Sequence, residues 1–337
     1  MNARYAKIIG TGRYVPEKRI TNAEMDPRFP EYQVKYGQPV SAWLEPNVGV
    51  KERHFAAPEQ VTSDLAVEAA RSALAQAKIK PEAIDLLIVA TDTPDYLSPA
   101  TANVVQHKLG AINAGVFDIN NACAAFVTGL IIGSKYIMTE PHYNTVLVIG
   151  AYAMSKYLDW KDYKTATIFA DGAGAAVLQA ADQPGFLTSA MKADGSFHDY
   201  MGIYVGGTYR IPTCEAIEKG EHHLVIAKRF PPDTNASNWP QLVRTVVADA
   251  GHEVNDIDRV YFTQININTI KEVMADLKLP LEKTHWIMDK WGYTGSACIP
   301  MTLDDHIEQG KGPKSGDLVV FCASGGGYAM AAAAFRW

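Results

Sequence analysis

The chain has 337 residues, of which 47% are hydrophobic and 20% charged, as is typical of a globular protein with a substantial core. The formal net charge of -6 provides no basic field for nucleic acid or anionic lipid, so we expect neither as a partner. The four cysteines are widely spaced, without a CxxC motif or a Cys/His pairing, which excludes a zinc site or a secreted disulfide framework. We therefore expect a cytoplasmic protein without a bound metal.

The first half of the chain alternates predicted strands and helices. Residues 27–53, rich in Pro, Gly and aromatics, predict a surface-covering loop segment. Apolar periodicity and turn signals predict a strand at 5–10, buried strands at 85–90, 115–119 and 145–150, and helices at 62–77, from about 99, and at 122–138.

Residues 122–138 are strongly apolar, and residues 171–174 are rich in glycine. The helix predicted at 122–138 is apolar nearly all round, which indicates a central, buried helix, and its apolar run at 122–133 is too short to span a bilayer. Residues 171–174, Asp-Gly-Ala-Gly, predict a turn feeding a small-residue strand. Because the Rossmann spacing and the P-loop lysine are absent, we interpret these glycines as packing residues.

The second half of the chain repeats the first at an offset of 173 residues. Residues 82–89 parallel residues 255–262, and Cys123 falls on Ser296, at the start of another small-residue-led helix. One βαβα unit is thus used twice, which predicts an α/β fold with parallel-rich sheets covered by helices.

We expect an N-terminal half at 1–180, carrying the nucleophile, and a C-terminal half at 181–337. Ligands in such folds bind at the carboxyl ends of strands. We therefore expect the site where four residues gather near the pseudo-symmetry axis: Cys123, Thr263, Tyr293 and Gly325.

Cys123 lies where a predicted strand turns into the buried helix. A thiol at a helix N-terminus faces unpaired backbone N–H groups and the positive end of the helix dipole, which favour thiolate over thiol. Cys123 is therefore placed like a nucleophile. The competing interpretation is a small core residue, since free cysteine is among the most often buried types.

Five short motifs occur in order at 49–54 (GVKERH), 89–91 (VAT), 121–126 (NACAAF), 171–178 (DGAGAAVL) and 325–328 (GGGY). Together they resemble β-ketoacyl-ACP synthase III of the thiolase superfamily over essentially the full length. The resemblance implies a thiolase fold, with duplicated βαβα halves in a five-layered αβαβα arrangement. It also implies a homodimer whose interface helps to form the acyl pocket.

The resemblance further implies that Cys123 takes an acyl group from a thioester, in covalent catalysis. The backbone N–H groups of Cys123 and Gly326 would bind the oxyanion. The donor would be an acyl-phosphopantetheine thioester on acyl carrier protein or coenzyme A, with no permanently bound cofactor. The candidate substrate-binding residues are Trp43, Ser98, Phe126 and Asn266.

The chain departs from this family at two catalytic positions. The family histidine belongs in a His-Gln-Ala-Asn segment, which here reads Thr263-Gln264-Ile265-Asn266, and the family asparagine belongs in Gly-Asn-Thr, which here reads Gly292-Tyr293-Thr294. Without both, decarboxylation of a malonyl thioester should be very slow. Family arginines that contact coenzyme A or the carrier correspond to Asn47, Tyr163 and Asn268.

These departures favour an acyltransferase that passes its acyl group from Cys123 to an acceptor other than malonyl-ACP, in specialised metabolism. Thr263, Tyr293 and Asp92 are the candidates for shaping or activating that acceptor. Asp92 follows the Val-Ala-Thr segment, where related HMG-CoA synthases carry a catalytic glutamate, and the competing interpretation is a loop residue before Pro94. The alternative functions are a carbon–carbon condensing enzyme with a rebuilt site and a non-catalytic subunit of a heterodimer.

Overall fold

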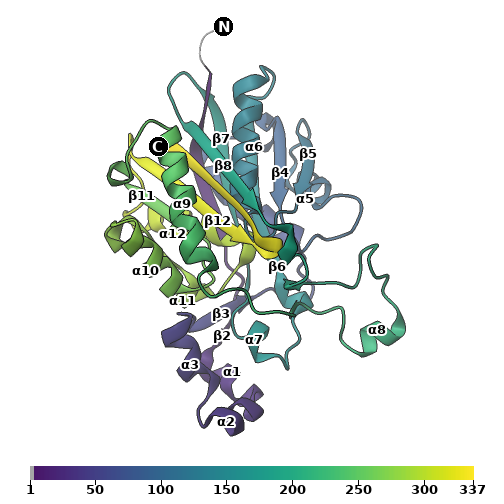
Figure 1. Ribbon diagram of the computed structural model, residues 1–337. Helices are drawn as coiled ribbons and strands as arrows, with labels where there is room; N and C mark the ends of the chain where they lie inside the picture. The colour runs from purple at the N-terminus through teal and green to yellow at the C-terminus, as the bar shows by residue number, and fades with distance from the viewer. Residues whose placement is uncertain (1–3) are drawn as a thin grey trace.

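The computed structural model describes residues 4–337 and contains two large β-sheets with helices between and outside them (Figure 1). One sheet has the strand order β1-β7-β6-β4-β5 and the other β11-β12-β13-β8. Their strands are β1 (Tyr5–Tyr14), β4 (Leu86–Ala90), β5 (Gly115–Ile119), β6 (Thr145–Ala153), β7 (Asp171–Ala181), β8 (Phe186–Ala193), β11 (Arg259–Phe262), β12 (Leu318–Gly325) and β13 (Ala329–Arg336). Two small sheets pair β2 (Lys18–Thr21) with β3 (Glu52–Phe55) and β9 (Met201–Gly202) with β10 (Val225–Ile226).

The helices divide into three layers around the two large sheets. The long ones are α4 (Thr62–Ala77), α5 (Thr101–Leu109), α6 (Ala125–Thr139), α9 (Thr234–Asp249), α10 (Ile267–Asp276) and α12 (Cys298–Glu308). The outer face of the first sheet is covered by α4 and α5, that of the second by α9 with α10 packed beside it, and α6 and α12 lie between the sheets. This is the expected five-layered αβαβα thiolase fold.

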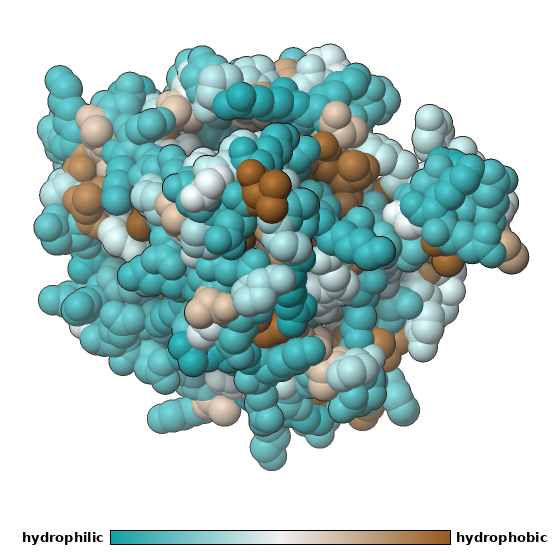
Figure 2. Space-filling model, turned by 90° about the horizontal axis from the view of Figure 1, so that it is seen from below, coloured by the Kyte–Doolittle hydropathy of each residue, from teal (hydrophilic) through white to brown (hydrophobic). Residues whose placement is uncertain are grey.

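Within residues 4–337, six short helices lie outside these layers. They are α1 (Asn22–Met25), α2 (Pro30–Tyr36), α3 (Val40–Asn47), α7 (Tyr163–Ala166), α8 (Cys214–Glu218) and α11 (Met288–Trp291). The face that carries α1 to α3 is mostly hydrophilic, with small separate hydrophobic patches, and the α8 segment projects from the body at the right (Figures 1 and 2).

The internal repeat predicted from the sequence is present in the fold. β4, α6 and β6 begin at Leu86, Ala125 and Thr145, and the residues 173 positions later begin β11, α12 and β12. In each half the two strands carry the parallel pairing, β4 with β6 and β11 with β12. The ends of these strands therefore converge on the same region from both halves.

The helix α6 is the apolar centre of the molecule. It contacts strands of both sheets, and a Cβ added at Gly129 or Gly133 would come within 3.0 Å of a valine of β6. Residues Ala122–Thr139 have the length and composition of a membrane span, but 67% of them are buried inside the protein. The apolar stretch is thus longer than the sequence interpretation allowed, and its apolarity is that of a core helix enclosed by two sheets.

The structure corrects three local predictions. Residues 27–53 are largely helical, because Tyr32, Val40 and Leu44 are buried and anchor α2 and α3 to the body. Residues 171–174 are not a turn but the beginning of β7. Their glycines are packing residues as predicted, since added Cβ atoms would lie within 2.8 Å of Met301 atoms. Gly115–Ile119 is the edge strand of its sheet and only partly buried.

Candidate active site

Cys123 lies in a tight turn between β5 and α6. Ala122 has a left-handed φ of 45°, and α6 begins at Ala125, so the cysteine precedes the first helical turn instead of belonging to it. Gly325, at the end of β12, packs directly against this turn: a Cβ there would come within 2.8 Å of the Cys123 backbone nitrogen. The motif around the cysteine and the glycine-rich motif are therefore in contact, as the sequence analysis expected.

The thiol of Cys123 is not held as a thiolate in the free protein. The residue is 5% exposed, and burial, followed by the charge of Asp92, raises the pKa of the thiol well above its usual value. The Tyr293 hydroxyl and the cysteine's own backbone N–H act on this pKa in the opposite direction. The expectation of a thiolate favoured by the helix terminus is thus wrong, because removal of solvent outweighs the nearby donors.

Two cavities meet at Cys123. The larger has a volume of about 610 Å³ and the smaller about 320 Å³, and both are lined by Cys123, Met201 and Gly326. A thioester carbonyl can therefore reach the sulfur from one side while a second group occupies the other. Cys123 is not sealed in the core, so its placement suits a nucleophile that handles two partners in turn.

Asp92 lines the smaller cavity together with Cys123. One carboxylate oxygen, Oδ1, is buried and has no hydrogen-bond partner within residues 4–337. Burial raises the pKa of Asp92 to about 6, near the range in which a carboxylate works as a general acid or base at neutral pH. The turn interpretation does not account for the uncompensated oxygen, although Asp92 does follow β4 in a loop.

Thr263 and Tyr293, both in the C-terminal half, line the larger cavity. The Thr263 hydroxyl donates to the carbonyl of Ser324 (3.3 Å) and accepts from its backbone N–H (3.0 Å), which ties the end of β11 to the end of β12. Burial raises the pKa of Tyr293 well above its usual value, so its hydroxyl is a neutral donor beside the Cys123 sulfur.

Two substrate-binding candidates, Trp43 and Asn266, line the larger cavity. Trp43 is 41% exposed on α3, which leaves its ring open to a ligand. Asn266 caps α10 by accepting from the backbone N–H groups of Asn268 (2.8 Å) and Thr269 (3.4 Å), so its Oδ1 is already engaged. The Asn268 side chain in turn donates to the carbonyl of Pro46 at 3.0 Å, which attaches α10 to α3.

The other two candidates lie elsewhere. Phe126 is fully buried in the central core and lines neither cavity at Cys123. Its position immediately after the first residue of α6 directs it into the packing between the sheets. Ser98 is exposed in the segment between β4 and α5 and also lines neither cavity.

Several lining residues were not found from the sequence. The smaller cavity has an aromatic wall that includes Tyr152, Phe169 and Tyr204, and His198 lies at its exposed rim. Tyr152 lies one residue before the end of the buried strand β6, so its place near the carboxyl end of a strand could have identified it. The others come from segments between strands, where no periodicity marks a contact. Within residues 4–337, no cluster of three or more His, Cys, Asp or Glu side chains could hold a metal ion.

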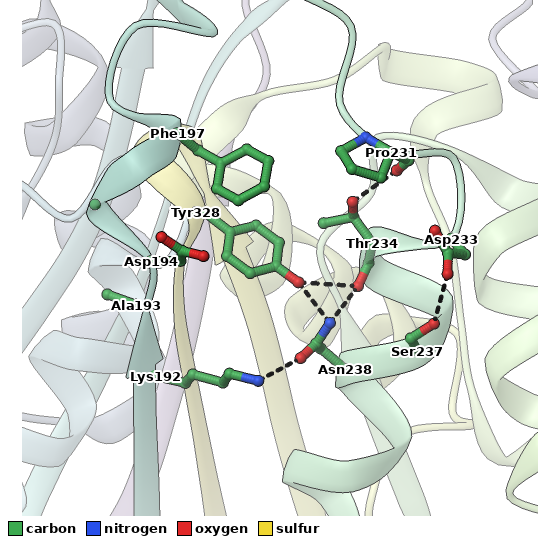
Figure 3. A pocket seen from close by; sticks show the side chains of 11 residues that line it. Lys192, Ala193, Asp194, Phe197, Pro231, Asp233, Thr234, Ser237, Asn238 and Tyr328 are labelled. Atoms are coloured by element: carbon green, nitrogen blue, oxygen red, sulfur yellow. Dashed lines mark hydrogen bonds between the residues drawn. The ribbon is translucent and has the colours of Figure 1, made fainter.

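A third cavity of about 530 Å³ lies beside the larger one and shares Tyr328 with it. Figure 3 shows the Tyr328 hydroxyl directed at Asn238 and Thr234, and Lys192 bonded to Asn238 at 2.7 Å. These polar side chains satisfy one another, and Cys123 is not in the lining. This cavity is therefore a surface recess behind the glycine-rich motif rather than the reaction site.

Known proteins are similar to this chain over nearly its whole length. A family model described as 3-oxoacyl-[acyl-carrier-protein (ACP)] synthase III matches residues 117–195, and the model of its C-terminal part matches residues 247–337. The β-ketoacyl-[acyl-carrier-protein] synthase III of Caldanaerobacter subterraneus is 37% identical over 98% of both chains. That of Symbiobacterium thermophilum is 36% identical over 100% of this chain and 99% of its own.

Solved structures are also similar to this chain over nearly its whole length. The 3-oxoacyl-[acyl-carrier-protein] synthase III of Aquifex aeolicus superposes with a TM-score of 0.86 and 31% identity, over 98% of this chain and all of its own. A priming β-ketosynthase of a polyketide biosynthetic pathway superposes with a TM-score of 0.88 and 26% identity, over 99% of this chain and 96% of its own.

Proposed function

Because this chain belongs to the 3-oxoacyl-[acyl-carrier-protein] synthase III family, we propose that Cys123 takes an acyl group from a carrier thioester and transfers it to a second substrate. The family is one of acyl-transferring condensing enzymes with the thiolase fold. The observation that carries the proposal is the position of Cys123 at the junction of two cavities, against the glycine-rich motif. A cysteine that only filled the core would need neither the two cavities nor the glycine-rich motif beside it. A non-catalytic subunit would have no need to keep both of them.

The first half-reaction needs a proton acceptor, because the Cys123 thiol is protonated at neutral pH. Asp92 is the group we assign to this role, since its pKa of about 6 leaves most of it ionised at pH 7. The thiol proton passes to Asp92, directly or through water, while sulfur attacks the thioester carbonyl. The tetrahedral oxyanion is held by the backbone N–H groups of Cys123 and Gly326. Collapse expels the carrier thiolate, which takes the proton back from Asp92.

We assign Tyr293 to the stabilisation of the sulfur rather than to proton removal. Its pKa is raised well above the usual value, so it stays protonated and donates toward the thiolate as it forms. Its contact with sulfur is strongest when charge develops there, which is the condition for lowering the barrier. Thr263 holds the ends of β11 and β12 together and thereby keeps the cavity wall in place.

The acceptor is proposed to differ from a malonyl thioester. Neither Thr263 nor Tyr293 replaces the family's histidine and asparagine as a donor to an enolate, because the Thr263 hydroxyl donates to the Ser324 carbonyl and we assign the Tyr293 hydroxyl to the sulfur. Loss of such donors typically costs about 10²–10⁴-fold. Carbon–carbon condensation remains the second candidate because the similar proteins are named β-ketoacyl synthases, and the similarity to a priming polyketide synthase supports a place in specialised metabolism.

The donor is proposed to approach through the larger cavity. Its lining includes the partly exposed ring of Trp43 and three cationic side chains, Lys164, Lys228 and Arg229, which suit the phosphates of a phosphopantetheine arm. We propose that these cations replace the coenzyme A-binding arginines of the family, whose positions are occupied here by Asn47 and Tyr163. Charge reversal at Lys164 or Arg229 should raise the KM for the donor about tenfold and leave kcat nearly unchanged.

A cytoplasmic homodimer is the proposed form of the enzyme. The loop that follows Asp92 exposes Tyr96 and Leu97, the latter to 85%, which supports its burial against a second copy of the chain. Sedimentation of the wild type beside Leu97→Glu tests this: the variant should shift toward monomer. A wild type that sediments as a monomer at micromolar concentration would contradict the proposal.

Intact-protein mass spectrometry tests the acyl transfer itself. Incubation with acetyl-, butyryl- and octanoyl-CoA or the corresponding carrier thioesters should add one acyl mass to the wild type and to Cys214→Ala, but not to Cys123→Ala. Cys214 is an exposed cysteine and reports nonspecific transfer. Malonyl-ACP added to the acyl-enzyme then separates the two candidates, because rapid release of carbon dioxide would support condensation and contradict a different acceptor.

A further inference from the structure

The smaller cavity carries an uncompensated negative charge. Burial, followed by the charge of Asp92, raises the pKa of Cys123, Tyr152 and Tyr157. No lysine or arginine is among the described residues that line this cavity, and the imidazole of His198 lies at its exposed rim. An acid that only had to shape the cavity would be expected to have a protein donor on its buried oxygen.

We propose that the smaller cavity binds a protonated primary amine, with its ammonium on Asp92, and that this amine is the acyl acceptor. This inference rests on the acyl transfer proposed above and adds the class of the second substrate. The buried Oδ1 without a partner is the site for the ammonium. The position beside Cys123 brings the amine nitrogen to the acyl group.

The walls of the cavity fit a small organic cation. Tyr152, Phe169 and Tyr204 contribute aromatic rings to the lining, and aromatic faces attract ammonium groups while keeping water out. A volume of about 320 Å³ accommodates a small molecule and not a carrier arm as well. The carrier arm and the amine therefore have separate cavities, and both reach the sulfur.

The transfer step balances with these groups alone. The ammonium gives one proton to Asp92, and the neutral amine nitrogen attacks the carbonyl carbon of the Cys123 thioester. The new C–N bond forms, the C–S bond breaks, and the departing sulfur takes the second amine proton to regenerate the thiol. The product is an amide, and Asp92 returns its proton to solvent. No oxidant, reductant or decarboxylation is required.

Butylammonium and its neutral counterpart butan-1-ol are suitable probes, with binding to the wild-type protein followed by saturation-transfer NMR. At pH 8 butylammonium should bind saturably, and its apparent affinity should fall at least tenfold by pH 5, as Asp92 takes up a proton. Asp92→Asn should lose the binding, while Asp182→Asn, at an exposed carboxylate, should retain it. His198→Gln should keep the same pH dependence, which separates the rim imidazole from Asp92.

Equal binding of butan-1-ol, or equal binding of butylammonium by Asp92→Asn, would overturn the ammonium site. The acceptor role has its own test: butylammonium added to the acyl-enzyme at pH 8 should remove the acyl mass and yield the N-butyl amide. Binding without amide formation would overturn that role. Failure of acyl-CoA and acyl-ACP to label Cys123 would instead contradict the underlying acyl transfer, whereas the NMR result does not depend on it.

Discussion

The hydroxyl of Tyr293 is the side-chain group that lowers the pKa of the Cys123 thiol, and the two residues line the same cavity although they come from different halves of the chain. The tyrosine follows α11 in the C-terminal half, and the cysteine precedes α6 in the N-terminal half. Because burial raises the thiol pKa so far, this donor is one of the few groups that oppose it. This effect on the thiol pKa gives a structural reason for a tyrosine at position 293, where the resemblance implied an asparagine.

Replacement of Tyr293 by phenylalanine should slow the reaction of Cys123 with iodoacetamide. A hydrogen bond to a charged group contributes about 1.5–3 kcal/mol, so the alkylation rate at pH 8 should fall at least about tenfold. Mass spectrometry of the alkylated protein measures the rate. Tyr152→Phe, in the lining of the smaller cavity, is the matched control and should react at nearly the wild-type rate. An unchanged rate in Tyr293→Phe would show that its hydroxyl does not act on the sulfur.

Asp92→Asn should change alkylation and acyl transfer in opposite directions. After burial, the Asp92 charge is the next largest cause of the raised pKa of Cys123, so its removal should increase the rate of alkylation by iodoacetamide at pH 8. The same change removes the proposed proton acceptor, so the acylation of Cys123 by acyl-CoA should slow about 10²-fold or more. Asp182→Asn should leave both rates unchanged. Parallel changes in the two rates would contradict the role of Asp92 as a base.

The sequence was sufficient to place the duplicated fold and the cysteine, because both depend on local patterns. The 173-residue repeat located the strands of both halves, and Cys123 stands at a strand-to-helix transition. The sequence did not reveal the ionisation of the thiol, since that depends on burial by residues distant in the chain. Nor did it show that Asp92 faces the sulfur's cavity or that Phe126 is directed into the core, because neighbouring positions along a chain can face opposite sides of the backbone.

Gly325→Ala should disrupt the site through the backbone alone. An added Cβ would come within 2.8 Å of the Asn121 carbonyl oxygen and the Cys123 nitrogen, so the cysteine turn must move. Displacement of reacting groups by about 1 Å can cost about 10²-fold in rate, and we expect a loss of acylation of that size. Gly207→Ala, which meets no atom within 4 Å, is the control, with circular dichroism to confirm folding of both. Normal acylation of a folded Gly325→Ala would contradict this contact.

The raised pKa of Asp92 should also make stability depend on pH. Its pKa is raised from 3.8 to about 6 in the folded protein, so folding favours the protonated form. Asp92 therefore contributes to the free energy of unfolding below about pH 4, which is its pKa in the unfolded chain. This contribution is lost as the pH rises through about 6, its pKa in the folded protein. A shift of this size corresponds to about 3 kcal/mol.

Asp92→Asn lacks this titration and should therefore gain stability over the wild type as pH rises. Thermal unfolding of both proteins without ligand should give a difference in midpoint that grows between about pH 4 and pH 7 and then levels off. The exposed Asp182→Asn should show a nearly constant difference over the same range. A constant difference for Asp92→Asn as well would mean that the carboxylate is solvated or paired in solution, and would also remove the basis for an ammonium site beside Cys123.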